Sequence, residues 1–152
     1  MNRRYGGSWA ERLATMFERE SLPFDRDIQR VPRSFDALRV AELAREHGKH
    51  AALHGRLMDA FWAHGRNLGD HEVLVEECGA VGLPEDEVRD VLAGDRYAEL
   101  VTLSTQGALE AGASGVPAFA IDSRILIPGA QPEEVFEQVF ERLGYSATAP
   151  PQ

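Results

Sequence analysis

The sequence predicts a mostly helical α/β chain with one β-hairpin close to its C-terminal end. Over the first two thirds of the chain, apolar side chains recur at three- and four-residue spacings, the period of amphipathic helices. After Gly115 the pattern changes to two short apolar runs, residues 118–121 and 125–127, which predict two strands joined by a tight turn. A last amphipathic helix is expected from Gln131 to Leu143. Because an isolated strand pair is only marginally stable in water, it needs helices and neighbouring strands packed against it.

Six helices are expected before the hairpin, each delimited by a capping residue, a proline or a glycine. They cover residues 8–20, 34–47, 49–64, 70–79, 84–93 and 95–112. The first helix carries Trp9 at apolar spacing, and the second carries a stripe that includes Leu38. The sixth helix is expected to turn its apolar side chains inward, namely Tyr97, Leu100, Val101, Leu103, Ala108 and Leu109.

Composition and net charge restrict the domain organisation and the partners that this chain is expected to have. A chain of 152 residues, 43% of them hydrophobic, fits one domain or one domain with an inserted subdomain. Its net charge of −9 argues against nucleic acid and anionic membranes as partners, since both require clustered Lys and Arg. No apolar run follows Arg3 and Arg4 as in a secretory signal, and none approaches the roughly 20 residues that cross a bilayer. These features predict a cytoplasmic protein.

The titratable residues provide no complete catalytic or metal centre. Cys78 is the one cysteine, so no intrachain disulfide can form, and its place among apolar residues of a helix indicates a structural role. His50 and His54 are four residues apart and could share a metal ion, but no third and fourth ligands are evident. We therefore assign no catalytic residue and no metal site to the sequence.

Five segments carry a resemblance to a known family: residues 34–39, 65–70, 94–98, 115–122 and 129–132. Their order and spacing resemble the DsbA-like thioredoxin-fold oxidoreductases of the FrnE-like branch, the relatives of polyketide isomerases and 2-hydroxychromene-2-carboxylate isomerases. The resemblance implies an α/β thioredoxin-like fold with a helical insert subdomain and, in this chain, an incomplete sheet. The implied division is an N-terminal helix and connector over 1–33, a helical insert subdomain over 34–94, the C-terminal part of the core over 95–143 and a disordered tail over 144–152.

The same resemblance implies a binding site at the start of the hairpin. Pro117 matches a cis-proline, and Val116 would offer its backbone groups to an extended peptide or to a thiol substrate. Gln131 matches the place where glutathione-using relatives bind the γ-glutamyl end of the tripeptide at a helix N-terminus. The alternative is that Glu133 and Glu134 complement the dipole of their own helix, which the sequence favours. No cofactor is required by the sequence, and glutathione remains open as a ligand.

The redox motif of the family, Cys-x-x-Cys, is absent, and the chain matches the family pattern only from well downstream of that motif. The chain is therefore expected to be N-terminally truncated relative to the family and catalytically incomplete as given. Two functions stay open: the substrate-binding part of a thiol–disulfide oxidoreductase or isomerase, or a non-catalytic peptide- or protein-binding module. Loss of the central strand also leaves residues 118–121 with an unpaired edge, which is expected to form a homodimer or to be covered by residues 1–33.

Overall fold

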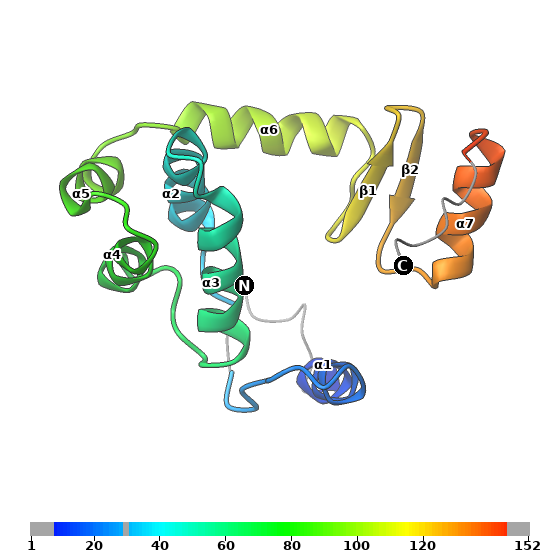
Figure 1. Cartoon of the computed structure of the whole chain (residues 1–152), viewed down its shortest axis with the longest axis horizontal. Coiled ribbons are helices and arrows are strands. Elements are labelled where there is room, and N and C mark those ends of the chain that lie inside the picture. Colours follow the sequence, from blue (N-terminus) through cyan, green and yellow to red (C-terminus); the bar gives the residue numbers. More distant parts are fainter. Residues whose placement is uncertain (1–7, 29–30, 146–152) are drawn as a thin grey trace, which may run out of the picture. The chain divides into compact units, whose positions relative to one another are not determined.

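The computed structural model describes residues 8–28 and 31–145, with the backbone alone for residues 8–10. The chain forms two compact units, Met1–Val101 and Thr102–Gln152. The first contains α1 (Ser8–Arg19), α2 (Phe35–Glu46), α3 (His50–Trp62), α4 (His71–Ala80), α5 (Glu85–Ala93) and the start of α6 (Ala98–Glu110) (Figure 1). The second contains the rest of α6, β1 (Ala118–Ile121), β2 (Ile125–Pro128) and α7 (Glu133–Arg142) (Figure 1).

Helices α2 to α5 enclose the core of the first unit (Figure 1). The apolar spacing of each helix supplies one face to this core, as amphipathic periodicity requires. Its largest fully buried side chains are Leu43, Leu53, Leu74, Val40, Val88, Val91 and Cys78. Burial of this apolar set is the main stabilising contribution to the unit.

Several predicted helix ends are confirmed by their caps. The Asp70 side chain accepts a hydrogen bond from the Glu72 N–H at 3.0 Å, which satisfies one of the free donors at the start of α4. Gly94 ends α5 as predicted. Ser34 does occupy the N-cap position of α2, but its side chain makes no capping hydrogen bond.

The second helix corrects the sequence prediction at one position. Leu38, predicted in the apolar stripe, is 48% exposed, whereas its neighbour Arg39 is 4% exposed. The Arg39 guanidinium enters the interior because it reaches polar partners there: it donates to the carbonyls of Val91, Gly94 and Arg96. A buried guanidinium needs such partners, since charge without hydrogen bonds is costly to bury.

Helix α1 attaches to the rest of its unit through aromatic side chains. The Phe17 ring lies 5.0 Å from the Phe24 ring and 5.5 Å from the Trp62 ring, between centroids. These separations fall in the range of favourable aromatic pairs. The predicted position of Trp9 on the same apolar face lies outside the described side chains.

The second unit is built on the predicted hairpin. Strands β1 and β2 pair antiparallel, with Phe119 opposite Ile127 and Ile121 opposite Ile125. The Phe119 ring meets the Phe136 ring of α7 edge-on at 5.0 Å, and Ile127 is 4% exposed. Because alternate residues share one face of a strand, Phe119, Ile121, Ile125 and Ile127 form the apolar face toward α7.

The sixth helix is shorter and less buried than the sequence predicts. It begins at Ala98 instead of residue 95, because Tyr97 has a φ of 65° and cannot continue a right-handed helix. Val101 is 6% exposed, as expected, whereas Leu100, Leu103 and Leu109 are 50%, 56% and 61% exposed. The expectation that these three leucines face inward is wrong, since apolar spacing indicates an amphipathic face but not which layer covers it.

Among the described residues, no helix combines the length and the apolar character needed to cross a bilayer. The disordered tail predicted for 144–152 falls outside the description from residue 146 onward.

Candidate functional site

Residues 116, 117 and 131, which the sequence singles out, come together at one end of the hairpin. The Gly129 N–H donates to the Pro117 C=O at 2.8 Å, which joins the start of β1 to the end of β2. The Gln131 side chain then reaches back and donates from Nε2 to the Pro128 C=O at 2.7 Å. Gly129 has a φ of 75°, a conformation that favours glycine, so the chain can turn sharply between these two bonds.

Val116 is the most exposed apolar residue of this end. Its relative exposure is 96%, and the bond that joins it to Pro117 is cis. Within residues 8–28 and 31–145, neither the N–H nor the C=O of Val116 has a hydrogen-bond partner. An exposed apolar side chain next to free backbone donors and acceptors fits a segment that adds as an extra strand.

Gln131 lies in the loop before α7, not inside the helix as the sequence predicts. Its amide N–H is used within the turn by the Pro128 carbonyl. Glu133 and Glu134 occupy the first turn of α7. Their charges complement the positive end of the helix dipole, so this terminus is already supplied with anions.

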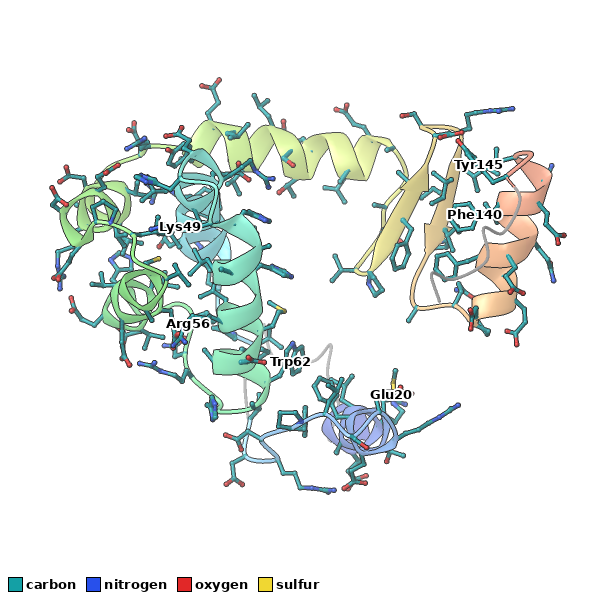
Figure 2. All side chains as sticks on the ribbon, in the orientation of Figure 1. Glu20, Lys49, Arg56, Trp62, Phe140 and Tyr145 are labelled. Carbon is teal, nitrogen blue, oxygen red and sulfur yellow. The ribbon has the colours of Figure 1, made fainter. Side chains whose placement is uncertain are left out.

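The opposite end of the hairpin is held by its own contacts. Asp122 and Ser123 both have a φ of 52°, and the Arg124 N–H donates to the Ile121 C=O at 3.0 Å. The Tyr145 hydroxyl donates to Asp122 Oδ2 at 2.8 Å, and the Tyr145 ring meets the Phe140 ring of α7 edge-on (Figure 2). The Asp122 carboxylate also raises the pKa of Tyr145, since it accepts from the neutral hydroxyl. The turn is thereby tied to α7.

Cys78 has the properties of a structural residue. It is 0% exposed inside the helical unit. Burial, with a smaller effect of Glu77, raises the pKa of the Cys78 thiol to about 12. A nucleophilic cysteine needs an accessible thiolate, so this thiol cannot act in disulfide exchange while the helical unit is folded.

Histidines 50 and 54 stack as parallel rings with centroids 6.1 Å apart. Arg45 directs its guanidinium to His50 Nε2 at 3.1 Å. Among the described side chains, no group of three His, Cys, Asp or Glu could hold a metal ion.

Two buried charged residues of the helical unit were not identified from sequence. Arg39 also donates from Nη1 to Asp36 Oδ1 at 3.0 Å, in addition to the carbonyls described above. Glu77 is 3% exposed and accepts from Arg56 at 2.8 Å and from Arg66 at 2.6 Å, so its charge is fully paired. No local sequence signal distinguishes these residues from other charges on helices.

Tyr97, which the sequence places among the inward side chains of the sixth helix, lies directly before α6. Its hydroxyl is buried with no hydrogen-bond partner among the described residues, and burial raises the pKa of Tyr97 to about 12. The Arg96 guanidinium lies over its ring, 4.8 Å from the centroid. The ring also packs against the helical core, which gives Tyr97 a structural role at the start of α6.

A family model, the DsbA-like thioredoxin domain, matches residues 6–141. The chain belongs to this family. The resemblance found in the five sequence segments is therefore confirmed at the level of the DsbA-like thioredoxin fold.

Two proteins are similar to this DsbA-like chain in structure or in sequence. It is similar to the crystal structure of the probable DsbA oxidoreductase SCO1869 from Streptomyces coelicolor, with a TM-score of 0.81 and 33% identity. That match covers 94% of this chain and 62% of the other. It is also 30% identical over 96 residues to the uncharacterized protein YwbO of Bacillus subtilis (strain 168), covering 62% of this chain and 48% of that protein. The chain thus spans about half to three fifths of the length of these relatives.

Proposed function

We propose that this chain is the substrate-holding part of a thiol–disulfide oxidoreductase of the DsbA-like family. In this role the backbone of Val116 binds an extended, cysteine-containing segment of a polypeptide as an added strand. The attacking thiol comes from residues outside this chain, because Cys78 is buried. The observation that carries the proposal is the 96% exposure of Val116, whose N–H and C=O have no hydrogen-bond partner in the described part of the chain.

The chain's contribution to disulfide exchange is positional. An external thiolate forms a bond to one sulfur of the substrate disulfide, and the other sulfur leaves as a thiolate. Backbone pairing at Val116 would hold the segment that carries the attacked sulfur and so reduce the entropic cost of bringing the reactants together. The exposed Val116 side chain would add apolar contact with the bound segment.

A polypeptide is favoured over glutathione as the ligand. Glutathione carries two carboxylates, whereas Glu133 and Glu134 already place negative charge at the nearby start of α7. The side-chain amide of Gln131 also donates from Nε2 to the Pro128 carbonyl. A neutral peptide backbone avoids the like-charge repulsion that a small anionic thiol would meet here.

The test is fluorescence anisotropy with a labelled, end-blocked peptide that holds one methyl-disulfide-capped cysteine between apolar residues. We expect saturable binding that Val116→Ala retains, because alanine keeps the backbone N–H. Val116→Pro removes that N–H and should weaken binding at least tenfold, which corresponds to about 1.4 kcal/mol. Absence of binding, or equal binding by the two variants, contradicts the proposal. Displacement of the peptide by reduced glutathione would instead favour the glutathione-using isomerase branch.

A further inference from the structure

The charged side chains of the second unit are divided between the two ends of its hairpin. Arg124 lies in the turn between β1 and β2, and Arg142 lies in the last turn of α7. The bond from the Tyr145 hydroxyl to Asp122 Oδ2 joins that end of α7 to the same turn. These two residues are the only arginines of the second unit, which has no lysine. Its cations therefore lie at the turn end of the hairpin, away from Val116.

The end of the hairpin at Val116 has two carboxylates close to it. The Gly129 N–H donates to the C=O of Pro117, the residue directly after Val116. Glu133, the first residue of α7, follows Gly129 by four residues, which span at most about 14 Å when fully extended. Glu134 comes next in the first turn of the helix. Both glutamates therefore lie within electrostatic range of a segment bound at Val116, since the Debye length is about 30 Å at about 0.01 M salt.

No cation offsets these two carboxylates within the described part of the second unit. Both side chains are exposed, and no arginine of that part forms an ion pair with either. The positive end of the α7 dipole is equivalent to about half a charge, which neutralises only part of two carboxylates. Lysine and arginine are also absent from residues 112–121 and 125–141. The second unit thus gives the surroundings of Val116 a net negative charge.

We propose that this site selects basic polypeptide segments, in which lysine or arginine lies close to the cysteine. The inference rests on the proposed function, because it concerns the segment that Val116 would bind. Glu133 and Glu134 act as specificity-determining residues, since they attract cationic side chains of the segment and repel acidic ones. The attraction needs no fixed ion pair, so lysine and arginine are both accepted.

The backbone and the side chain of Val116 leave charge as the property that distinguishes one segment from another. Backbone pairing accepts almost any sequence, since every residue except proline offers the same N–H and C=O. The Val116 side chain, 96% exposed, favours an apolar residue beside the cysteine but no particular one. Charge acts before contact and raises the rate of association. A basic segment would therefore bind faster and more tightly than a neutral segment of the same shape.

The test is fluorescence anisotropy of the 152-residue chain with three end-blocked peptides that carry the same label. Each holds a methyl-disulfide-capped cysteine between apolar residues, and they differ only in two outer residues, which are lysine, glutamine or glutamate. At about 10 mM salt, the lysines should tighten binding about three- to tenfold relative to glutamine, and the glutamates should weaken it by a similar factor. At about 1 M salt, where the Debye length is about 3 Å, the three affinities should converge.

Two double variants separate this local effect from the net charge of −9 on the whole chain. Glu133→Gln with Glu134→Gln removes two charges near Val116, so the lysine and glutamine peptides should bind with nearly equal affinity. Glu137→Gln with Glu141→Gln removes the same charge about 8 Å farther along the helix axis and should keep most of the lysine preference. Circular dichroism reports whether each variant is folded. The salt dependence of the unaltered chain provides a second measurement that needs no variant.

The outcomes separate this inference from the proposed function. Equal affinity for all three peptides at low salt would overturn the charge preference and leave peptide holding intact. Equal loss of the lysine preference in the two double variants would show a general attraction to an acidic chain, which also contradicts a role for Glu133 and Glu134. Absence of binding by all three peptides would contradict the proposed function and this inference with it.

Discussion

Replacement of Arg39 by methionine tests whether the buried guanidinium holds the helical unit together. Methionine keeps the apolar stem but removes every donor. The Val91 carbonyl, whose bond to Arg39 is buried, would lose its partner, as would the half-buried carbonyls of Gly94 and Arg96. An unsatisfied buried acceptor costs about 1–3 kcal/mol and a lost half-buried bond less, so we expect a loss of about 3–5 kcal/mol in total.

That loss is a large fraction of the ordinary stability of a domain, about 5–15 kcal/mol. In urea, with a slope of about 1–3 kcal/mol per molar, it lowers the unfolding midpoint by about 2 M. Far-UV circular dichroism reports this transition, because the helical unit holds most of the helices. Arg39→Lys should also lose most of the stabilisation that Arg39 contributes, since a lysine ammonium lacks the planar guanidinium fork that reaches these acceptors.

The matched control is Arg45→Met on the same helix. The Arg45 side chain is 58% exposed and pairs with Glu42 across one turn. Exposed pairs of this kind contribute little to stability, so the midpoint should hardly move. If Arg39→Met lowers the midpoint no more than Arg45→Met does, the guanidinium is not a structural centre and the reasoning above is wrong.

Three further predictions follow from single side chains. Burial acts to raise the pKa of Asp36, but hydrogen bonds from Arg39 and His71 outweigh this effect and lower the pKa. The stability that Asp36 contributes is present above its unfolded pKa of about 3.9 and is lost as the pH falls toward the folded value. Asp36→Asn should therefore flatten the acid unfolding curve below about pH 4. With a pKa of about 12, the Cys78 thiol should react with iodoacetamide at pH 8 about 10³-fold more slowly in the folded chain than in urea. Mass spectrometry measures the two rates of alkylation, and equal rates would contradict the burial of Cys78. Gly129→Ala puts a side chain at a φ of 75° and should destabilise the hairpin by about 1–2 kcal/mol. Amide exchange in the hairpin should become faster, and unchanged exchange would show that the turn tolerates alanine.

The hairpin was predictable because its determinants are local. Two short apolar runs, turn residues between them and Gly129 after them all lie within one stretch of the chain, and the structure places β1 and β2 where these signals predict. The start of α4 was predictable for the same reason, since Asp70 caps the helix through the N–H of Glu72, two residues along the chain. Signals of this range can be identified from a short stretch of consecutive residues.

The burial of Arg39 could not be predicted from consecutive residues. Its acceptors at Val91 and Gly94 lie 52 and 55 residues along the chain, and they become acceptors only because α5 ends beside α2. Hydrophobic periodicity therefore assigned Leu38 to the core and left its charged neighbour outside. The leucines of α6 failed in a related way, because periodicity describes one helix and burial depends on a second surface.

Under the proposed function, thiol chemistry and substrate holding belong to different parts of the protein, because Cys78 is buried and Val116 is exposed. Cys78 packs in the same core as Leu74 and Val88, both 0% exposed, so its exposure would require the helices around it to open. Such an opening would consume much of the stability of the helical unit, and it is rare at equilibrium. Val116, in contrast, presents its backbone groups without any opening. A peptide could therefore be bound by the folded chain at once, while disulfide exchange would wait for a thiol brought by another molecule or another segment.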